Sequence, residues 1–303
     1  MKNSNSAKQR WRGRLAVASI VFFGRWPLAI NRLIGVLVGW CLWVFPNDNR
    51  STAKVNLDLC FPHQSAKQKA RLLRQSLRET GKSTLEIAYV WRNPQRALTH
   101  INRVEGLALL EQAQLAKRAV VILAPHHGCW ELLNYWVSQR YPFHVLYSPS
   151  GLDAVDRLIA QSREAFQSVT HPATARGIVG LVRALKQGNM TGILPDQVPD
   201  RKSTHFAPFF DQPASTPSLA CRLVQQTNAV AFCCFVKRLP GVQGFDVIIR
   251  QADTGIYSNN LNTALAAMNR SIEALIREAP EQYLWSYKRF RRRPHGEPNP
   301  YQQ

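Results

Sequence analysis

Hydrophobic and polar positions follow two alternating periods from residue 119 onward. Short aliphatic runs bounded by Gly, Pro or polar residues predict buried strands at 119–123, 143–147, 192–194, 230–236 and 245–249. Between most of these runs, apolar residues recur every three or four positions, which predicts helices at 130–138, 155–166, 178–187 and 218–226. Strands that alternate with helices predict an α/β fold with a mixed, largely parallel sheet flanked by helices.

The regions on either side of this alternation are mainly helical. Helical periodicity covers 65–91, another helix is expected to start at 104 and run to 115, and an amphipathic helix spans 260–278 before Pro280. The stretch 47–62 is polar and is interpreted as a connector. We therefore divide residues 47–303 into a helical lead-in (47–116), an α/β core (117–279) and a basic aromatic tail (280–303).

The N-terminal region 1–46 has a polar, basic start followed by two apolar runs, Leu15–Phe23 and Leu33–Phe45. Neither run reaches the roughly 20 apolar residues that span a bilayer. A signal peptide fits poorly, because no small-residue cleavage site follows a single apolar core. Membrane attachment is favoured over a buried core helix, in one of two forms: one tilted anchor over Ala16–Phe45, or two short helices lying in the membrane interface. Both predict a membrane-anchoring helical region whose basic flank stays cytoplasmic.

Charge points to an anionic partner. The chain has 39 Lys and Arg against 19 Asp and Glu, a formal net charge of +20. Such an excess favours nucleic acid, an anionic membrane or an acidic carrier protein, but no zinc-finger spacing, RNP-like segment or basic region with heptads is found. The tail at 283–293 mixes aromatic and basic residues and suits a membrane surface, RNA or solvent. With the apolar N-terminus, membrane is the favoured interpretation and nucleic acid is not.

Several kinds of site are not supported by motifs. No H-E-x-x-H, Walker, G-x-G-x-x-G or G-x-S-x-G sequence is present, so we predict no metal and no nucleotide cofactor. The six cysteines form no C-x-x-C pair, which indicates reduced, buried thiols. Cys129 is interpreted as structural, although a nucleophile is the alternative.

The candidate chemistry centres on residues 120–136. An aliphatic run leads into Pro125, then His126 and His127, and a predicted helix follows with Glu131 on its first turn. On one regular helix, His126 and Glu131 would lie about 140° apart, so they meet only if His126 lies in the loop. A histidine backed by a carboxylate is a general-base arrangement. The alternative is a capped helix with a surface histidine.

A second block, residues 192–200, places polar residues at the end of another predicted strand. The strand brings Asp196 and Gln197 to the edge where open α/β sheets bind ligands, so Asp196 is expected to face the same cleft as His126. The alternative is a turn, since Pro-Asp is common there. Arg163, on the predicted helix between the two blocks, could hold a phosphate or a developing oxyanion, or could simply be solvated.

The run Pro-His-His-Gly-Cys-Trp-Glu around His126 and Glu131 resembles the H-x4-[D/E] signature of glycerolipid-type acyltransferases. In its Glu form it resembles the late acyltransferases of lipid A biosynthesis, also called the lysophospholipid/lauroyl acyltransferase family. The resemblance covers nearly the whole chain and extends to four further blocks: 56–62, 80–86, 192–197 with 208–210, and 280–293. It implies a glycerolipid-acyltransferase-like sandwich.

By this resemblance, His126 is the general base, Glu131 its partner, and Arg163, Asp196 and Gln197 support the site. The implied reaction moves a fatty acyl group from an acyl carrier protein or coenzyme A thioester to a hydroxyl of a phosphorylated lipid A precursor. It needs no cofactor and no covalent acyl-enzyme, and takes place at the cytoplasmic face of the inner membrane. Two alternatives stay open: another glycolipid or aminolipid acceptor, and a basic membrane-binding protein without catalysis.

One departure from the family pattern concerns phosphate binding. Family members often carry Tyr-Arg-Pro after the second strand of the core, whereas this chain has Tyr147-Ser148-Pro149. Either an arginine elsewhere holds the phosphate or the acceptor differs.

Overall fold

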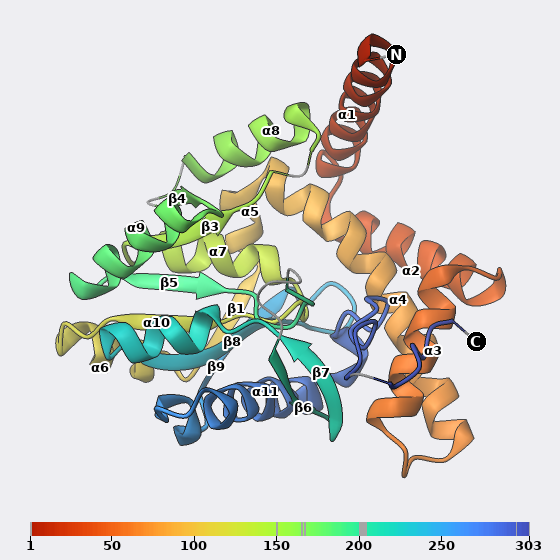
Figure 1. Cartoon of the computed structure of the whole chain (residues 1–303). Helices are drawn as coiled ribbons and strands as arrows, with labels where there is room; N and C mark the ends of the chain where they lie inside the picture. The colour runs from red at the N-terminus through yellow and green to blue at the C-terminus, as the bar shows by residue number, and fades with distance from the viewer. Residues whose placement is uncertain are drawn as a thin grey trace.

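A computed structural model describes residues 2–149, 151–164, 166, 168–199, 205–294 and 296–302, without the side chains of 2–8, 10, 163 and 164. Its centre is a seven-stranded sheet in the order β1-β9-β8-β2-β5-β3-β4 (Figure 1). The strands are β1 (Ile101–Glu105), β2 (Val120–Leu123), β3 (Phe143–Tyr147), β4 (Ser168–Pro172), β5 (Met190–Ile193), β8 (Val230–Arg238) and β9 (Phe245–Gln251). A separate antiparallel pair joins β6 (His205–Phe209) and β7 (Gln212–Thr216).

Strand direction confirms the predicted sheet type. Of the neighbouring pairs in the seven-stranded sheet, only β8 and β9 run antiparallel, and the others are parallel. β8 and β9 form a hairpin, because only a short connection separates these two long antiparallel strands. The sheet is therefore mixed and largely parallel, as the alternation of strands and helices predicts.

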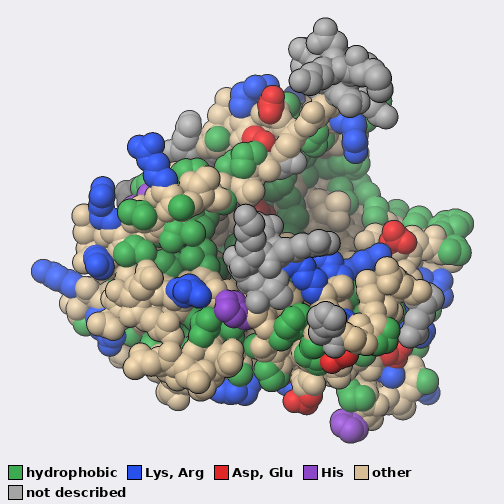
Figure 2. Space-filling view, viewed as in Figure 1, with side chains coloured by type: hydrophobic (Ala, Val, Ile, Leu, Met, Phe, Trp, Pro, Cys, Tyr) green, Lys and Arg blue, Asp and Glu red, His purple; other side chains and the backbone are tan. Residues whose placement is uncertain are grey.

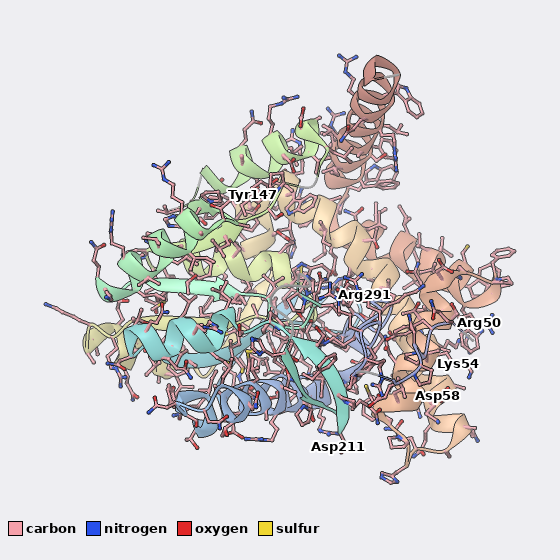
Figure 3. The ribbon with its side chains drawn as sticks, in the orientation of Figure 1. Arg50, Lys54, Asp58, Tyr147, Asp211 and Arg291 are labelled. Atoms are coloured by element: carbon pink, nitrogen blue, oxygen red, sulfur yellow. The ribbon has the colours of Figure 1, made fainter. Side chains whose placement is uncertain are left out.

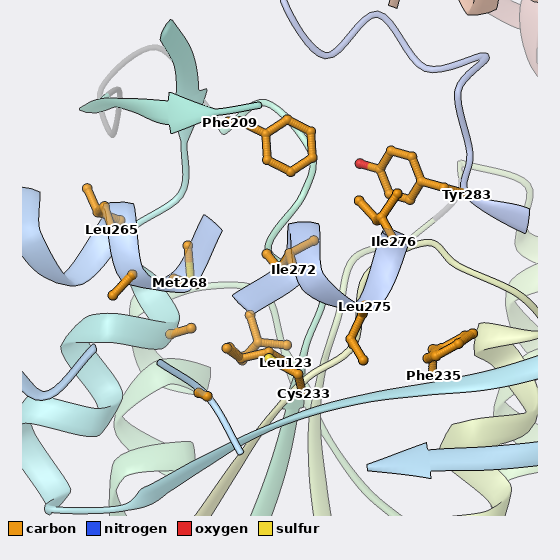
Figure 4. Close-up of a cluster of buried hydrophobic side chains, with 14 of the residues drawn as sticks. Leu123, Phe209, Cys233, Phe235, Leu265, Met268, Ile272, Leu275, Ile276 and Tyr283 are labelled. Atoms are coloured by element: carbon orange, nitrogen blue, oxygen red, sulfur yellow. The ribbon is translucent and has the colours of Figure 1, made fainter. Parts of the chain in front are cut away.

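Helices cover both faces of the sheet, and β2 shows why. Its side chains alternate between two cores: Val121 and Leu123 enter one, and Val120 and Ile122 the other. The first core is closed by α9 (Ala175–Lys186), α10 (Leu219–Thr227) and α11 (Leu261–Glu278), and Figure 4 shows α11 above the sheet. The second is closed by α5 (Pro94–Leu98), α6 (Leu107–Leu115) and α7 (Trp130–Ser138). The remaining core helix, α8 (Asp153–Glu164), contacts α1 and α4.

The predicted connector at 47–62 is wrong, because this stretch forms α3 (Asp48–Cys60). Asn47 caps the helix by accepting a hydrogen bond from the amide of Arg50. The helix that was expected to start at 104 also differs, since 101–105 is strand β1 and Gly106, with φ 81°, turns the chain into α6. The polar residues of α3 and the exposed positions of β1 weaken the hydrophobic pattern from which each element could be predicted.

The N-terminal region forms two helices, α1 (Lys2–Gly24) and α2 (Leu28–Val44), which break between residues 24 and 28. A single tilted anchor over Ala16–Phe45 is therefore wrong as one helix. By length and hydropathy, no single helix among the described residues is suited to crossing a membrane, although α2 and α3 pass together as a pair bent by 78°.

α2 packs closely along α4 (Ala66–Arg92). A Cβ added at Gly35 or Gly39 would come within 2.5 Å or 2.4 Å of an α4 backbone atom, so only glycine allows this approach. Arg32 of α2 is buried, and its Nε donates to Glu86 of α4 at 2.8 Å. Its two Nη atoms donate to backbone carbonyls at 239, 241 and 244, just after β8.

Glu86 accepts a second buried guanidinium. Arg238, at the end of β8, donates to Glu86 at 2.6 Å and to Glu79 at 2.8 Å. A buried carboxylate shared between two arginines is compensated on both sides. This network ties α2, α4 and β8 into one unit.

Candidate active site

The parallel register of β2 and β5 places His126 beside Asp196. Leu123 lies opposite Ile193, and the amide of Ala124 still donates to the Ile193 carbonyl at 2.9 Å. His126 follows Leu123 by three residues, and Asp196 follows Ile193 by three, so the same offset of 70 holds for both pairs. Two parallel strands that end together thus deliver one histidine and one carboxylate to the same point of the sheet edge.

Two hydrogen bonds fix the histidine on Asp196. The Nδ1 of His126 lies 2.9 Å from Asp196 Oδ1, and the His126 backbone amide donates to Oδ2 at 2.9 Å. Asp196 is only 2% exposed. With the proton on Nδ1 donated to the carboxylate, Nε2 carries a lone pair and accepts from the amide nitrogen of Gln197 at 3.2 Å. The reactive nitrogen of a general base is therefore the one that faces away from Asp196.

The electrostatics of this pair favour a basic imidazole. Burial by itself would lower the pKa of His126, but the charge and hydrogen bond of Asp196 and the charge of Glu131 raise it above its usual value. Burial would likewise raise the pKa of Asp196, whereas His126 and the charge of Arg289 hold it below its usual range. Asp196 accordingly stays ionised and stabilises a proton on His126.

An apolar cleft lies between α7 and the sheet, and the ring of Trp130 in its lining lies 5.3 Å from the His126 ring. Its upper residues, Ala124 and Leu194, come two positions before His126 and Asp196. Near its far end the Phe143 ring covers Gly192, where a Cβ would come 2.6 Å from the ring. The other lining residues are Ile122, Trp130, Glu131, Leu133, Asn134, Val145 and Leu146.

Comparison with known proteins gives the family. The model of the bacterial lipid A biosynthesis acyltransferases matches residues 2–292. The lipid A biosynthesis palmitoleoyltransferase of Escherichia coli K12 is 30% identical over 276 residues, which cover 91% of this chain and 89% of that protein. The chain belongs to the bacterial lipid A biosynthesis acyltransferase family. It is therefore an O-acyltransferase, and the resemblance seen in its motifs is confirmed.

More distant family members differ in the acyl group in their names. The E. coli K12 lipid A biosynthesis lauroyltransferase is 26% identical, over 81% of this chain and 80% of that protein. The E. coli K12 lipid A biosynthesis myristoyltransferase is 22% identical, over 96% of this chain and 90% of that protein. The family thus includes enzymes named for three different acyl chains.

In this acyltransferase, Glu131 is not the carboxylate at Nδ1 of His126. It lies on the first turn of α7, as expected, and its Oε2 accepts a hydrogen bond from Trp91 Nε1 at 2.9 Å. Its charge acts on His126, but the carboxylate at Nδ1 belongs to Asp196. The physical reason is the parallel register of β2 and β5, which brings His126 and Asp196 together although they are 70 residues apart. Glu131 is only five residues from His126, but the chain turns between them at Gly128 (φ 61°).

His127 has a structural environment. It is fully buried, donates through Nε2 to the Ala279 carbonyl at 2.9 Å, and stacks on Phe235 with ring centroids 4.0 Å apart. Burial lowers the pKa of His127 to about 4, so it is neutral near pH 7. Cys129 is also buried, and burial raises the pKa of its thiol well above the usual value. These features favour His126 as the base and a structural role for Cys129.

The phosphate-binding candidates remain predictions. Arg163 lies near the end of α8, but its side chain is outside the described residues. Tyr147, which Figure 3 labels, precedes the unusual Ser148 and donates a hydrogen bond to Asp156 of α8. A cavity of about 400 Å³ between α1 and α8 is lined by Arg14 and Arg157, with Asp153 beside them.

Proposed function

We propose that this enzyme transfers a fatty acyl group from an acyl thioester directly to a hydroxyl of a lipid A precursor, with His126 as general base. The observation that carries the proposal is the hydrogen-bonded pair of His126 and Asp196 beside an apolar cleft, whose lining residue Trp130 contacts the His126 ring. Family membership supports the reaction class and the lipid A pathway.

The chemistry follows from the tautomer. A hydroxyl is a poor nucleophile at neutral pH, and Nε2 of His126 takes its proton as the oxygen attacks the thioester carbonyl. A carbon–oxygen bond forms, the carbon–sulfur bond breaks, and the leaving thiolate receives the proton from the imidazolium. Asp196 stabilises that imidazolium, and general-base help of this kind contributes about 10²–10⁴-fold. The amide of Gln197 occupies the position at Nε2 that the acceptor hydroxyl takes over.

The cleft below the pair suits the acyl chain. Its lining is mostly apolar, and it extends from Leu194 down to Phe143, which pairs with Met190. Four strand residues at about 3.3 Å each give a depth of roughly 13 Å. Because Phe143 packs on Gly192 at the deep end, this ring would limit the length of chain that enters.

Replacing Phe143 with alanine is expected to shift donor preference toward longer chains. Each added methylene that is buried contributes about 0.8 kcal/mol, so a chain longer by two carbons should gain roughly tenfold in relative kcat/KM. Competition between two donors of different length measures this ratio. Phe232→Ala, a buried ring on β8 outside the cleft, is the matched control and should lower stability without changing the ratio. An unchanged ratio in Phe143→Ala would show that the chain lies elsewhere.

The outer side of α2 supports a membrane location. Leu33, Leu37, Trp40 and Val44 recur every three or four residues and are 63%, 57%, 53% and 44% exposed, on the side opposite α4. Figure 2 shows apolar side chains at the outer right of the molecule, where Figure 1 places α2. We propose that this stripe lies in the cytoplasmic leaflet of the inner membrane, where an acceptor lipid resides. The net charge of +20 suits anionic lipid and an acidic acyl carrier protein as donor partner.

The proposal is tested with the purified full-length protein in mixed micelles. It is supplied with a lipid A precursor and with matched acyl carrier protein and coenzyme A thioesters, and the products are read by mass spectrometry. The expected product is the precursor plus one acyl group, formed faster from the carrier protein. Transfer only to another glycolipid or to an aminolipid would show that a lipid A precursor is not the acceptor. Vesicle binding with no transfer to any acceptor would favour a non-catalytic membrane protein.

A further inference from the structure

The C-terminal segment, residues 279–293, forms the rear wall of the site. Its sequence predicts a surface tail, yet the amide of Leu284 donates to the His126 carbonyl at 3.0 Å, and the amide of Gly128 donates to the Gln282 carbonyl at 3.1 Å. The hydroxyl of Tyr287 accepts a hydrogen bond from the Val198 amide at 3.0 Å, two residues after Asp196. The segment therefore holds both loops that carry the catalytic pair.

Arg289 in this segment is buried, at 2% exposed. Its Nη1 donates to the Ser215 carbonyl at 2.5 Å, its Nη2 to the Thr216 hydroxyl at 3.0 Å, and its guanidinium lies 5.2 Å from the centre of the Phe209 ring. Its buried Nε has no hydrogen-bond partner among the described residues. All of these contacts are to neutral groups, and a buried charge is costly unless an opposite charge compensates it.

Asp196 is the buried anion beside this segment, two residues before Val198, whose amide donates to the Tyr287 hydroxyl. Burial and the charge of nearby Asp196 raise the pKa of the Tyr283 hydroxyl, and the Tyr283 ring packs on Phe209 with centroids 6.3 Å apart. Phe209 thus contacts both Tyr283 and Arg289. Tyr283 itself lies opposite His127 in a backbone bridge, which fixes it beside the histidine loop. Figure 4 shows Tyr283 and Phe209 side by side above α11.

We propose that Arg289 is a positioning residue of the acyl-transfer site, where its buried guanidinium balances the charge of Asp196 across Phe209 and Tyr283. The inference rests on the proposed function, because it gives Arg289 a role through the carboxylate that holds the general base. Without this countercharge, Asp196 would be an uncompensated anion facing His126.

The sign of the effect follows from these charges. Loss of the positive charge at 289 leaves more of the Asp196 field for His126, so protonated His126 is favoured and its pKa rises further. The acid limb of the kcat/KM profile, where the base becomes protonated, should move to higher pH by about one unit. Glu131 also acts on His126 and is unchanged. The other titratable groups around Arg289 are Tyr283, Tyr287, Tyr301 and Cys60.

The experiment compares Arg289→Gln, which keeps a donor for the Ser215 carbonyl, with Arg289→Lys, which keeps the charge. Lys288→Met is the matched control, since it removes an exposed charge from the adjacent position. The acid limb of kcat/KM and the NMR titration of the His126 ring are measured on the full chain in micelles. We expect both midpoints to rise in Arg289→Gln and to stay in place in Arg289→Lys and Lys288→Met.

An unmoved midpoint in folded Arg289→Gln, with only a lower kcat, would overturn the inference and leave Arg289 a purely structural residue. If that variant does not fold, Arg289→Met, which removes the same charge, replaces it. Its acid limb must then move in the same direction, and an unmoved limb rejects the inference. The ring titration needs no turnover. A shifted titration without acyl transfer would reject the proposed function alone.

Discussion

Alanine at position 126 should reduce acyl transfer by about 10²–10⁴-fold while the protein stays folded. The side chain of His126 is partly exposed, and its ring is hydrogen-bonded to the side chains of Asp196 and Gln197. Its removal takes away the group that accepts the acceptor's proton but leaves the backbone amide bonded to Asp196. The loss should therefore appear in kcat more than in the KM for the thioester.

The measurement is steady-state acyl transfer, with thermal unfolding as a check on the fold. His63→Ala is the matched control because His63 is exposed and lies in the loop before α4. It should transfer acyl groups at the normal rate. If His126→Ala kept more than about a tenth of the activity, the base would have to be another group and the proposed mechanism would fail.

Asp196→Asn should cost nearly as much, about 10²–10⁴-fold in kcat. An asparagine amide can present its NH2 group to Nδ1, which places the histidine proton on Nε2 and removes the lone pair that the reaction needs. The sign of the pH effect is also defined. Asp196 raises the pKa of His126, so without the carboxylate that pKa falls and the acid limb of the remaining activity moves to lower pH.

Glu131→Gln provides the comparison that separates structure from sequence motif. Glu131 is bonded to Trp91 and influences His126 through charge, so its amide should cause a smaller loss of kcat than Asp196→Asn. Rate and pH profiles of the two variants are measured side by side. A larger loss of kcat in Glu131→Gln than in Asp196→Asn would show that Glu131 is the functional partner of the base. It would contradict the functional role that we assign to the hydrogen bond between His126 and Asp196.

Much of the α/β core could be predicted from the sequence because its signals are local. The helix Trp130–Ser138 and the strand Phe143–Tyr147 match their predicted bounds to the residue, since each is an apolar run that ends at turn residues. α3 was hidden because its inward face mixes polar Thr52 and Asn56 with apolar Leu57. Asn56 is buried to bind the carbonyls of Trp285 and Tyr287, a contact 229 and 231 residues away.

The site itself depended on contacts that local spacing does not reveal. His126, Asp196 and Gln197 were each expected at the edge of the sheet, and the structure brings all three together. The sequence pairs His126 with Glu131, whereas the structure places Asp196 at Nδ1, because strand register is a relation between distant segments. A usable signal is present in the sequence. His126 and Asp196 each lie three positions after the end of a strand, and each directly follows a proline. The burial of Arg289 had no such signal, since a run of arginines is usually solvated.

The shared carboxylate of Glu86 has a consequence for how the enzyme works on a surface. Because Arg32 and Arg238 both bind it, the apolar stripe of α2 and the end of β8 are parts of one rigid body. With the stripe in the bilayer, as proposed, His126 would stand at a set height, whereas a catalytic domain on a flexible tether could search above the membrane. The enzyme would then select its acceptor partly by depth, accepting hydroxyl groups that the lipid presents at the level of His126.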